Sequence, residues 1–193
     1  MKVFLTGGTG FIGAHLINAL LAEGKQVHAL VRTPAKASSL PVEGVTILKG
    51  DILDPKSIKE AMQGCEEVYH LGGNASIYEK DPQRYYTINV DGTKNVMDAA
   101  IDLGIKRMVF TSTAGVLGPS VGGVVTEDKK REVPFFNEYE SSKASPKESR
   151  TMCQSPKRLG MVESFMELLH TKPCQIREFC STIFLERTHY IPF

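Results

Sequence analysis

The sequence predicts an α/β protein built on a doubly wound parallel sheet. Short strand-like runs alternate with helix-like segments over the first 143 residues, and a cluster of glycines separates the first strand from the first helix. Strands and helices that alternate at this pace form parallel pairs through right-handed crossovers. In such a sheet the ligand lies outside the carboxyl ends of the strands.

Each expected element has a local signal. Apolar residues recur at helical spacing from Phe11 to Ala22, and Gly24 ends that helix. Pro55 occupies a favoured first-turn position of a second helix, and a third helix is expected from Asn89 to Leu103. The strands are expected at residues 2–6, 26–32, 45–49, 67–71 and 107–111.

Composition and charge exclude several classes of protein. Of the 193 residues, 41% are hydrophobic and 23% are charged, a balance typical of globular chains. The formal net charge of +1 leaves no basic excess for a nucleic-acid backbone. No apolar run approaches the roughly 20 residues that span a bilayer, and the glycines come too early for the apolar core of a signal peptide. We therefore expect a cytoplasmic protein with no nucleic-acid or membrane partner.

The chain has four cysteines, Cys65, Cys153, Cys174 and Cys180. Their spacing fits neither a Cys-x-x-Cys pair nor a small disulfide-rich scaffold, which predicts free thiols. His170 and His189 lie in the same stretch as the last two cysteines, but no two of these four residues have the close spacing of a zinc ligand pair. The sequence therefore predicts no metal site.

The turn after the first strand has the spacing of a nucleotide-binding motif. Its glycines fit both G-x-G-x-x-G and G-x-x-G-x-x-G, beginning at Gly8 or at Gly7 and continuing through Gly10 and Gly13. Residues without a Cβ permit a tight turn and a close approach of backbone amides to a diphosphate. The helix that begins at Phe11 then directs its amides and the positive end of its dipole at the phosphates. A tight turn without a ligand is the alternative interpretation.

The end of the second strand bears on the choice of cofactor. NAD sites usually place an acidic residue about 20 residues beyond the glycines to bind the ribose hydroxyls. The segment from Ala29 to Lys36 contains none. Arg32 can present its guanidinium to a 2′-phosphate, and Lys36 adds charge. This favours NADP(H), with NAD(H) as the second choice; the alternative is that Arg32 is a solvated strand-end residue.

Tyr139 and Lys143 are four residues apart and would share one face of a helix. Asn137 and Glu140 have the spacing of a capping box, so this helix can begin just before the tyrosine. An adjacent ammonium lowers the pKa of a phenol, and such a tyrosine can act as a general acid or base near neutral pH. A pair with this spacing also arises in helices by chance.

Three hydroxyls stand at the expected carboxyl end of the fifth strand, on Thr111, Ser112 and Thr113. One of them can hold a substrate oxygen beside the tyrosine. The alternative is a polar strand end whose hydroxyls cap the backbone.

These segments, in this order, resemble the extended short-chain dehydrogenase/reductase family, also called NAD-dependent epimerase/dehydratases. The resemblance runs from Met1 to about Lys143 and implies a Rossmann fold. Its motifs are the glycine turn at 6–13, Gly50-Asp51-Ile52, residues 68–73, residues 89–93, residues 111–113, and Tyr139 with Lys143. Arg32, the Gly64-Cys65 segment and residues 111–115 look most like the dihydroflavonol 4-reductase and 3β-hydroxysteroid dehydrogenase branch.

The resemblance implies roles in cofactor binding for most of these residues. Phe11 and Ile12 would offer backbone amides to the diphosphate, next to the glycine turn of Gly7, Gly10 and Gly13. Asp51 would accept from the adenine amino group, with Ile52 beside the ring. Leu71, Gly72 and Gly73 would line the ribose and nicotinamide side.

The resemblance also implies a catalytic set. Thr113 stands where the family has its catalytic serine or threonine, and Tyr139 would exchange the proton with the substrate. Lys143 would bind the nicotinamide ribose and lower the pKa of the tyrosine. Hydride would pass between the nicotinamide and a carbonyl or carbinol carbon.

After Lys143 the resemblance stops, and we expect a nucleotide-binding Rossmann domain at 1–143 and an atypical tail at 144–193. Pro146 would disrupt the catalytic helix three residues beyond the lysine. The tail suggests only a short helix at 161–169 and a strand at 175–185, so the substrate-binding part is missing or atypical. A truncated or frame-altered product is the favoured explanation; a shortened natural member and an unfamiliar cap are the alternatives.

Three functions stay open. The favoured one is an NADP(H)-dependent oxidoreductase acting on a small carbonyl or alcohol substrate. The second is a sugar-nucleotide epimerase or dehydratase that keeps NAD bound, which Arg32 disfavours. The third is a nucleotide-binding module without catalysis, or an inactive fragment, which the missing substrate half favours. The resemblance also implies a homodimer paired through the helix at 89–103 and the helix from Tyr139 onward.

Overall fold

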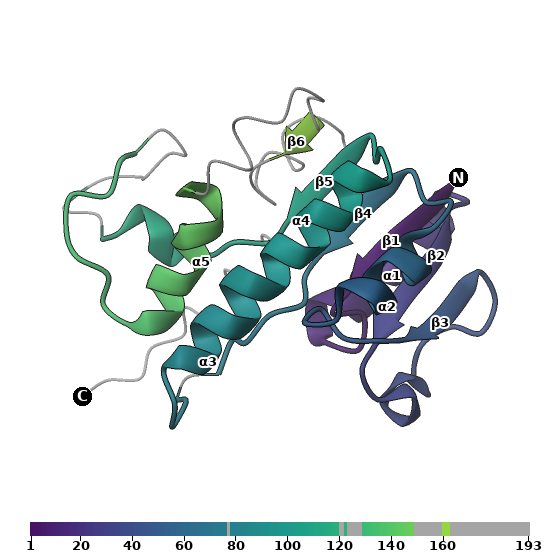
Figure 1. The fold of residues 1–193 in the computed structure, drawn as a ribbon, viewed down its shortest axis with the longest axis horizontal. Helices are drawn as coiled ribbons and strands as arrows, with labels where there is room; N and C mark the ends of the chain where they lie inside the picture. The colour runs from purple at the N-terminus through teal and green to yellow at the C-terminus, as the bar shows by residue number, and fades with distance from the viewer. Residues whose placement is uncertain (77, 120–121, 123–128, 149–159, 163–193) are drawn as a thin grey trace.

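The computed structural model describes residues 1–76, 78–119, 122, 129–148 and 160–162. Its strands form one parallel sheet in the order β3-β2-β1-β4-β5-β6 (Figure 1). The strand bounds are Lys2–Thr6 (β1), Gln26–Val31 (β2), Val45–Lys49 (β3), Glu67–His70 (β4), Arg107–Phe110 (β5) and Gly160–Val162 (β6). The chain starts at the centre of the sheet, moves to one edge, returns and moves to the other, which confirms the predicted doubly wound fold.

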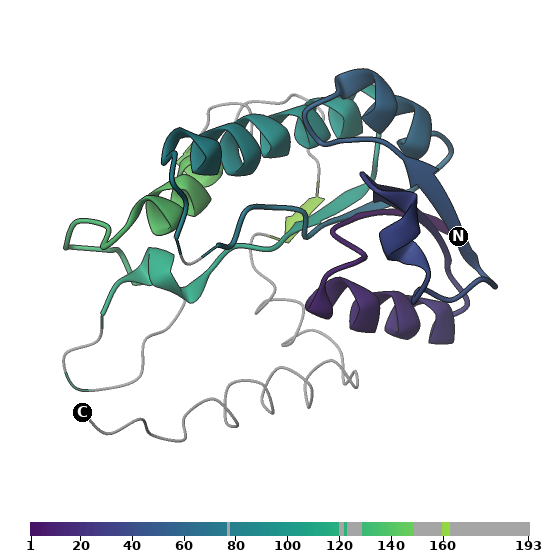
Figure 2. The ribbon, with the colours of Figure 1, turned by 90° about the horizontal axis from the view of Figure 1, so that it is seen from below.

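Helices cover both faces of this sheet (Figure 2). α1 (Phe11–Ala22) lies on one face, and α2 (Pro55–Met62) and α4 (Gly92–Asp102) lie on the other. Short 3-10 turns follow β2 and β5, at Pro34–Ala37 (η1) and Ala114–Leu117 (η3). Right-handed crossovers place successive helices on one face while the chain moves toward one edge, and on the opposite face while it moves toward the other.

The alternation of side chains along β1 divides the core between the two faces. Val3 and Leu5 are buried against α1. Phe4 is buried on the opposite face with Ile58 of α2 and Val96 of α4. Each fully buried side chain of this size contributes about 1.5–3 kcal/mol. The two clusters therefore fix the central strands, and with them the loops at their carboxyl ends.

The helix before β5 begins earlier than the sequence predicts. It starts as α3 (Gln83–Tyr86), continues through a π-helical turn at Thr87–Asp91 (η2) and ends in α4. The expected start at Asn89 is wrong, because a π turn adds a residue per turn and interrupts the apolar spacing that located the helix. The turn leaves Asn89 completely buried.

Two predictions about the last described elements are also wrong. α5 (Glu138–Glu148) continues past Pro146, since a proline removes only its own N–H bond and the neighbouring bonds hold the turn. The helix expected from Met161 begins instead as strand β6, which pairs in parallel with β5. A short apolar run fits either structure, and the edge of β5 supplies the partner for a strand.

The division of the chain at Lys143 stays a prediction, although α5 extends across that position. Residues 163–169 of the expected helix and the expected strand at 175–185 lie outside the described residues.

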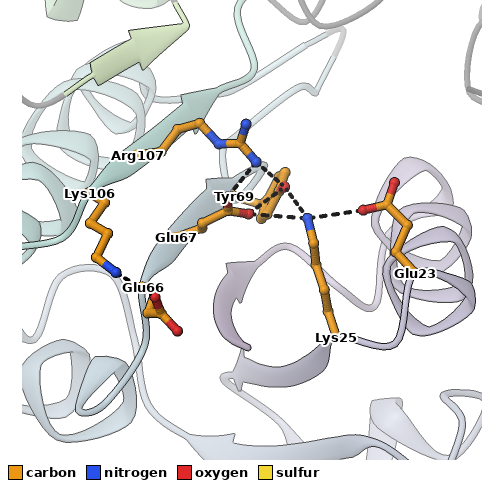
Figure 3. Close-up of polar contacts among 7 residues, drawn as sticks. All are labelled: Glu23, Lys25, Glu66, Glu67, Tyr69, Lys106 and Arg107. Carbon is orange, nitrogen blue, oxygen red and sulfur yellow. Dashed lines mark hydrogen bonds and ion pairs between the residues drawn. The ribbon is translucent and has the colours of Figure 1, made fainter. Parts of the chain in front are cut away.

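A network of charged side chains ties the amino ends of the central strands together (Figure 3). The Glu67 carboxylate pairs with Lys25 at 3.2 Å and with Arg107, and it accepts from the Tyr69 hydroxyl at 3.0 Å. Lys25 also pairs with Glu23 at 3.1 Å, after the end of α1. Burial alone would raise the pKa of Glu67, but hydrogen bonds from Arg107 and Tyr69 lower it. The network therefore joins α1, β4 and β5 at the amino edge of the sheet.

Cys65 is a free, half-buried thiol, and burial raises its pKa to about 11. The other three cysteines lie outside the described residues. Among the residues with described structure, no group of three or more His, Cys, Asp or Glu side chains is placed to hold a metal ion. None of the helices in those same ranges has the length and apolar character to cross a bilayer.

Candidate functional site

The carboxyl ends of five strands bring the candidate residues to one edge of the sheet. Because β1 to β5 pair in parallel, the segments that follow them leave from the same side. These segments hold the glycine turn after β1, Arg32 after β2, Asp51 after β3, Leu71–Gly73 after β4 and Thr113 after β5. β1 and β4 are neighbours from which the chain departs toward opposite edges, which is where doubly wound sheets bind ligands.

Gly7 and Gly13 let backbone segments approach more closely than a side chain would permit. Gly7 has a φ of +78°, and a Cβ there would lie 2.8 Å from the backbone of Leu71. A Cβ at Gly13 would lie 2.2 Å from the Gly7 carbonyl oxygen. That oxygen accepts from the Gly10 N–H at 3.0 Å. The turn therefore has the close packing that the motif predicts, and α1 follows it at Phe11 as expected.

The amino end of α1 is exposed and carries no side-chain cap. Phe11 and Ile12, its first residues, are 66% and 40% exposed. The N-cap residue Gly10 offers no side-chain acceptor, and the first turn holds no acidic residue. A Cβ at Gly10 would meet only the Gly7 carbonyl oxygen, at 3.3 Å. A helix start of this kind presents backbone N–H groups and the positive end of its dipole to an external anion.

Arg32 and Lys36 lie at the same edge, but in the described ranges no hydrogen bond or ion pair joins either side chain to another candidate residue. Arg32 follows β2 by one residue, and Lys36 is part of η1. Both side chains are exposed, and neither forms an ion pair within the described part of the chain. The two cations are therefore accessible to an anionic group at the end of β2.

The turn that holds Asp51 and Ile52 is fixed to the helices on either side. The Asp51 N–H donates to Ser57 Oγ at 3.1 Å, and the Asp51 carboxylate accepts from the Leu53 N–H at 3.0 Å. Ile52 packs against Gly92, where a Cβ would lie 2.8 Å from its side chain. The residues expected on the adenine side thus occupy a well-anchored turn after β3.

Thr113 and Tyr139 are brought close together. The Thr113 hydroxyl accepts from the Gly115 N–H at 3.3 Å. Burial raises the pKa of Tyr139, and the interaction with the Thr113 side chain opposes this shift without reversing it. The net direction is opposite to the lowered pKa expected from Lys143, because the lysine ammonium lies over another ring.

Lys143 extends from α5 toward the strand ends. The residue is only 5% exposed, and its Nζ lies 4.5 Å from the centroid of the Phe110 ring. A Cβ at Gly73 would lie 3.6 Å from the same nitrogen. Burial lowers the pKa of Lys143 to about 8, so the side chain stays mostly protonated at neutral pH. The structure thus places the ammonium next to Gly73, in the loop that follows β4.

The other two predicted hydroxyls differ from Thr113. Thr111 Oγ1 and Ser112 Oγ are buried and have no hydrogen-bond partner among the residues that the structure describes. Buried hydroxyls without a partner are uncommon, because burial without a hydrogen bond costs free energy. Their position at the end of β5 is consistent with a bound polar group at this edge.

The predicted cap of α5 forms with one change. The Glu140 N–H donates to Asn137 Oδ1 at 2.8 Å, as a capping box requires. The Glu140 carboxylate accepts from the Phe136 N–H at 3.1 Å, one residue before the expected partner. The helix begins at Glu138, and its first turn carries Tyr139.

Arg131 contributes to the site although no sequence pattern indicates it. Its Nε donates to the Val133 carbonyl at 2.8 Å, and its guanidinium also donates to the Gly115 carbonyl and pairs with Glu140 at 3.2 Å. The side chain is 8% exposed. Arg131 therefore joins the turn that holds Thr113 to the helix that holds Tyr139.

Asn89 is a second residue whose contribution the sequence did not reveal. Its Oδ1 accepts from the Asn74 N–H at 2.7 Å, and its Nδ2 donates to the Asn74 carbonyl at 3.0 Å and to Ser142 Oγ at 2.9 Å. It thus connects the loop after β4 to α5. The available signal was its place in the motif at 89–93, where a polar residue opens an otherwise amphipathic helix.

Comparison with known proteins agrees with this architecture. The model of the NAD dependent epimerase/dehydratase family matches residues 3–151. The chain is 41% identical over 118 residues to a Synechocystis protein provisionally named a dihydroflavonol 4-reductase, covering 60% of this chain and 33% of that protein. It is 34% identical over 144 residues to a 3-beta-hydroxysteroid dehydrogenase of Mycolicibacterium neoaurum, covering 72% of this chain and 38% of that protein.

A solved structure extends the comparison to the fold. The UDP-glucose 4-epimerase of Thermus thermophilus, in complex with NAD, aligns with a TM-score of 0.68 at 29% identity. The alignment covers 76% of this chain and 49% of that chain. This chain spans a third or slightly more of the length of the two curated relatives, at 33% and 38%.

The two curated relatives carry the names of the branch that the sequence predicts, so that expectation is confirmed. The family match covers most of the chain and includes the glycine turn and the strands around it. The chain belongs to the NAD dependent epimerase/dehydratase family.

Proposed function

We propose that this chain supplies the cofactor site and the proton-transfer groups of an NADP(H)-dependent oxidoreductase. The enzyme would transfer hydride between the cofactor and a small carbonyl or alcohol substrate. One observation carries the proposal: Thr113, just after β5, interacts with Tyr139 in the first turn of α5, and the same helix extends Lys143 to the end of β5. The names of the relatives, a reductase and a dehydrogenase, support the same class of reaction.

The chemistry follows from these three side chains. When bound, the nicotinamide supplies the hydride for the carbonyl carbon. Tyr139 donates its phenolic proton to the substrate oxygen, and its raised pKa keeps the phenol protonated until that step. Thr113 binds the same oxygen through its hydroxyl. Lys143 would bind the nicotinamide ribose, because its ammonium lies beside Gly73 in the loop that follows β4.

The preference for NADP(H) rests on the end of β2. Arg32 is exposed there without an ion-pair partner in the described ranges, and no acidic residue occupies 29–36. A guanidinium binds a phosphate in bidentate geometry, whereas it offers no acceptor to the hydroxyls of an unphosphorylated ribose.

A sugar-nucleotide epimerase or dehydratase is the second candidate. The alignment with a UDP-glucose 4-epimerase in complex with NAD favours it. A nucleotide-binding module without catalysis is the third candidate, which the turnover assay below distinguishes from the other two.

Cofactor titration and turnover by the purified chain test the proposal. Followed by cofactor fluorescence, NADPH should bind more tightly than NADH. Equal affinity for the two would contradict the role of Arg32. Binding without oxidation of NADPH, across a panel of aldehydes and ketones, would favour the module.

The first prediction concerns the proton donor. Tyr139→Phe removes only the hydroxyl, so it should bind NADPH like the wild type and lower turnover by about 10²-fold or more. Tyr78→Phe is the matched control, because Tyr78 is 80% exposed and takes no part in the site. Undiminished turnover in the Tyr139 variant would contradict the assignment of the proton donor.

A further inference from the structure

His70 is completely buried at the end of β4, and none of the proposed steps uses it. Its ring lies between two threonine hydroxyls from different elements. Thr6 Oγ1 is 2.7 Å from Nδ1, and Thr93 Oγ1 is 3.0 Å from Nε2. Thr6 ends β1 immediately before Gly7, and Thr93 lies in the first turn of α4. The Thr6 hydroxyl oxygen also accepts from the Gly72 N–H at 2.9 Å.

The direction of these hydrogen bonds follows from the groups involved. The Gly72 N–H can only donate, so the hydrogen of the Thr6 hydroxyl has one remaining partner in the described part of the chain, Nδ1 of His70. The distance of 2.7 Å suits an O–H donor, and the distance of 3.0 Å on the other side suits an N–H donor.

The two threonines also differ in their other partners. The Thr6 hydroxyl oxygen already accepts from the Gly72 N–H. In the described part of the chain Thr93 Oγ1 is bonded only to His70 Nε2, so its oxygen is available as an acceptor. A ring that accepts from Thr6 and donates to Thr93 fits both distances and carries its hydrogen on Nε2.

This chain of bonds joins two backbone segments that flank the proposed dinucleotide site. A Cβ at Gly7 would lie 2.8 Å from the Gly72 nitrogen, so the segments are in close contact. A Cβ at Gly72 would lie 2.9 Å from Thr6 Oγ1. The Thr6 hydroxyl thus bridges the segments, and His70 fixes where that hydroxyl points.

The surroundings keep the ring neutral. Burial, and then the charge of Lys143, lower the pKa of His70 to about 3. The ring stacks on Phe110 with centroids 5.8 Å apart, and Lys143 Nζ lies 4.5 Å from the centroid of that same ring. A protonated ring would carry a donor on both nitrogens and would no longer accept from Thr6.

We propose that His70, as the Nε2–H tautomer, is a positioning residue for the dinucleotide. Acting through the Thr6 hydroxyl, it sets the spacing between the glycine turn at 7–13 and the loop at 71–73. The inference rests on the proposed cofactor site and adds to it a residue that does not itself bind the cofactor.

Nitrogen NMR of the imidazole rings tests the tautomer without any cofactor. The chain has five histidines, and the signal of His70 is the one lost in His70→Asn. We expect a protonated Nε2 and an unprotonated Nδ1, unchanged between about pH 5 and 9 because the ring is buried. A hydrogen on Nδ1, or titration of the ring in that interval, would overturn the proposal.

Two variants of His70 separate positioning from stability. Asparagine keeps an acceptor for Thr6 near the place of Nδ1, whereas glutamine keeps a donor for Thr93 and loses the Thr6 acceptor. Asparagine also leaves the larger cavity, so His70→Asn should be the less stable of the two in denaturant. It should nevertheless bind NADPH about tenfold more tightly than His70→Gln. If His70→Asn were both the less stable variant and the weaker binder of NADPH, His70 would have a structural role only, and the proposal would be wrong.

Variants of the two threonines complete the test. Thr6→Val should weaken NADPH binding about tenfold, whereas Thr6→Ser keeps the hydroxyl and should retain the wild-type affinity. Thr93→Val removes the acceptor of the Nε2 hydrogen, so it should lower stability and should weaken NADPH binding less than Thr6→Val does. If the wild type binds NADPH and Thr6→Val binds it equally well, the inference alone fails. If the wild type binds neither NADPH nor NADH, the proposed function fails and the positioning role fails with it.

Discussion

Gly13 and Gly7 show how the absence of single atoms shapes the candidate site. A Cβ at Gly13 would lie 2.2 Å from the Gly7 carbonyl oxygen, the same oxygen that accepts from the Gly10 N–H. A methyl group there must displace either the turn or the start of α1. Both are the backbone that the proposal assigns to the diphosphate, so crowding at this point should affect binding as well as folding.

The second prediction follows from that crowding. Gly13→Ala should destabilise the fold by about 1–3 kcal/mol through overpacking and should weaken NADPH binding about tenfold or more. Gly24→Ala is the control: its φ of +72° makes alanine unfavourable, but a Cβ there meets nothing within 4 Å. It should lower stability, measured by denaturant unfolding, and leave the affinity for NADPH as it is. An equal loss of affinity for NADPH in both variants would contradict the assignment of the glycine turn as the binding element.

Lys143 gives a third prediction, on pH. Its pKa in the folded chain is about 8, below the ordinary value of 10.5, so the unfolded chain binds more protons between those limits. The stability contributed at this position therefore rises as the pH increases from about 8 to about 10.5. Lys143→Met lacks this pH dependence and should be more stable than the wild type at pH 7, because it buries no charge. The difference between their free energies of unfolding should shrink by about 2–3 kcal/mol by pH 10, as denaturant unfolding would measure. A constant difference would contradict the lowered pKa.

At the scale of elements, Arg131 connects parts of the chain that carry different functional groups. Its guanidinium contacts the Gly115 carbonyl, just after Thr113, and the Glu140 carboxylate, just after Tyr139. A Cβ at Gly115 would lie 2.8 Å from that carboxylate, so the turn and the helix are already in close contact. Arg131, which lies outside both elements, therefore helps to hold Thr113 beside Tyr139.

The fourth prediction is that Arg131→Lys loosens the amino end of α5. Lysine keeps the charge but has three donors on a single nitrogen, so it cannot replace a planar guanidinium that contacts four acceptors, the carbonyls of Val133, Gly115 and Pro134 and the Glu140 carboxylate. Amide hydrogen exchange at Glu140 and Ser141 should become faster, about tenfold for the loss of one net hydrogen bond, while exchange in β1 stays unchanged. Lys130→Met, an exposed neighbour, should change neither. Unchanged exchange at α5 in the Arg131 variant would exclude this role.

Elements marked by local chemistry could be predicted from the sequence. β1, β3 and α1 have the predicted bounds, because short apolar runs, helical apolar spacing and a stop at Gly24 specify them locally. The start of α3 and the continuation of α5 past Pro146 could not be predicted, since a π turn interrupts the apolar spacing and neighbouring bonds outweigh one proline.

The same distinction between local and long-range signals applies to the residues of the candidate site. The glycine turn, Tyr139 and Lys143 form short motifs with fixed spacing and could be found in the sequence. Asn89 binds Ser142 across 53 positions, and Arg131 reaches back to Gly115 across 16. Such contacts exist only after the elements have packed, so no local pattern indicates them.

In the molecule as a whole, the charged network that stabilises the sheet and the residues of the candidate site lie at opposite ends of the strands. At the amino edge, a charged network joins α1, β4 and β5, and it consists of Lys25, Glu67, Tyr69 and Arg107. At the carboxyl edge, the loops are held by close backbone packing and by buried polar residues such as His70 and Asn89. Parallel pairing makes this division possible, because every strand contributes its carboxyl end to the same edge.

The central claim is that this carboxyl edge binds a pyridine dinucleotide on the backbone of the glycine turn. A crystal structure of the chain grown with saturating NADP+ tests it most directly. We predict that the diphosphate lies against the first amides of α1, the nicotinamide ribose near Lys143 and the 2′-phosphate near Arg32. A dinucleotide bound elsewhere on the chain, or no dinucleotide at saturation, would contradict the account.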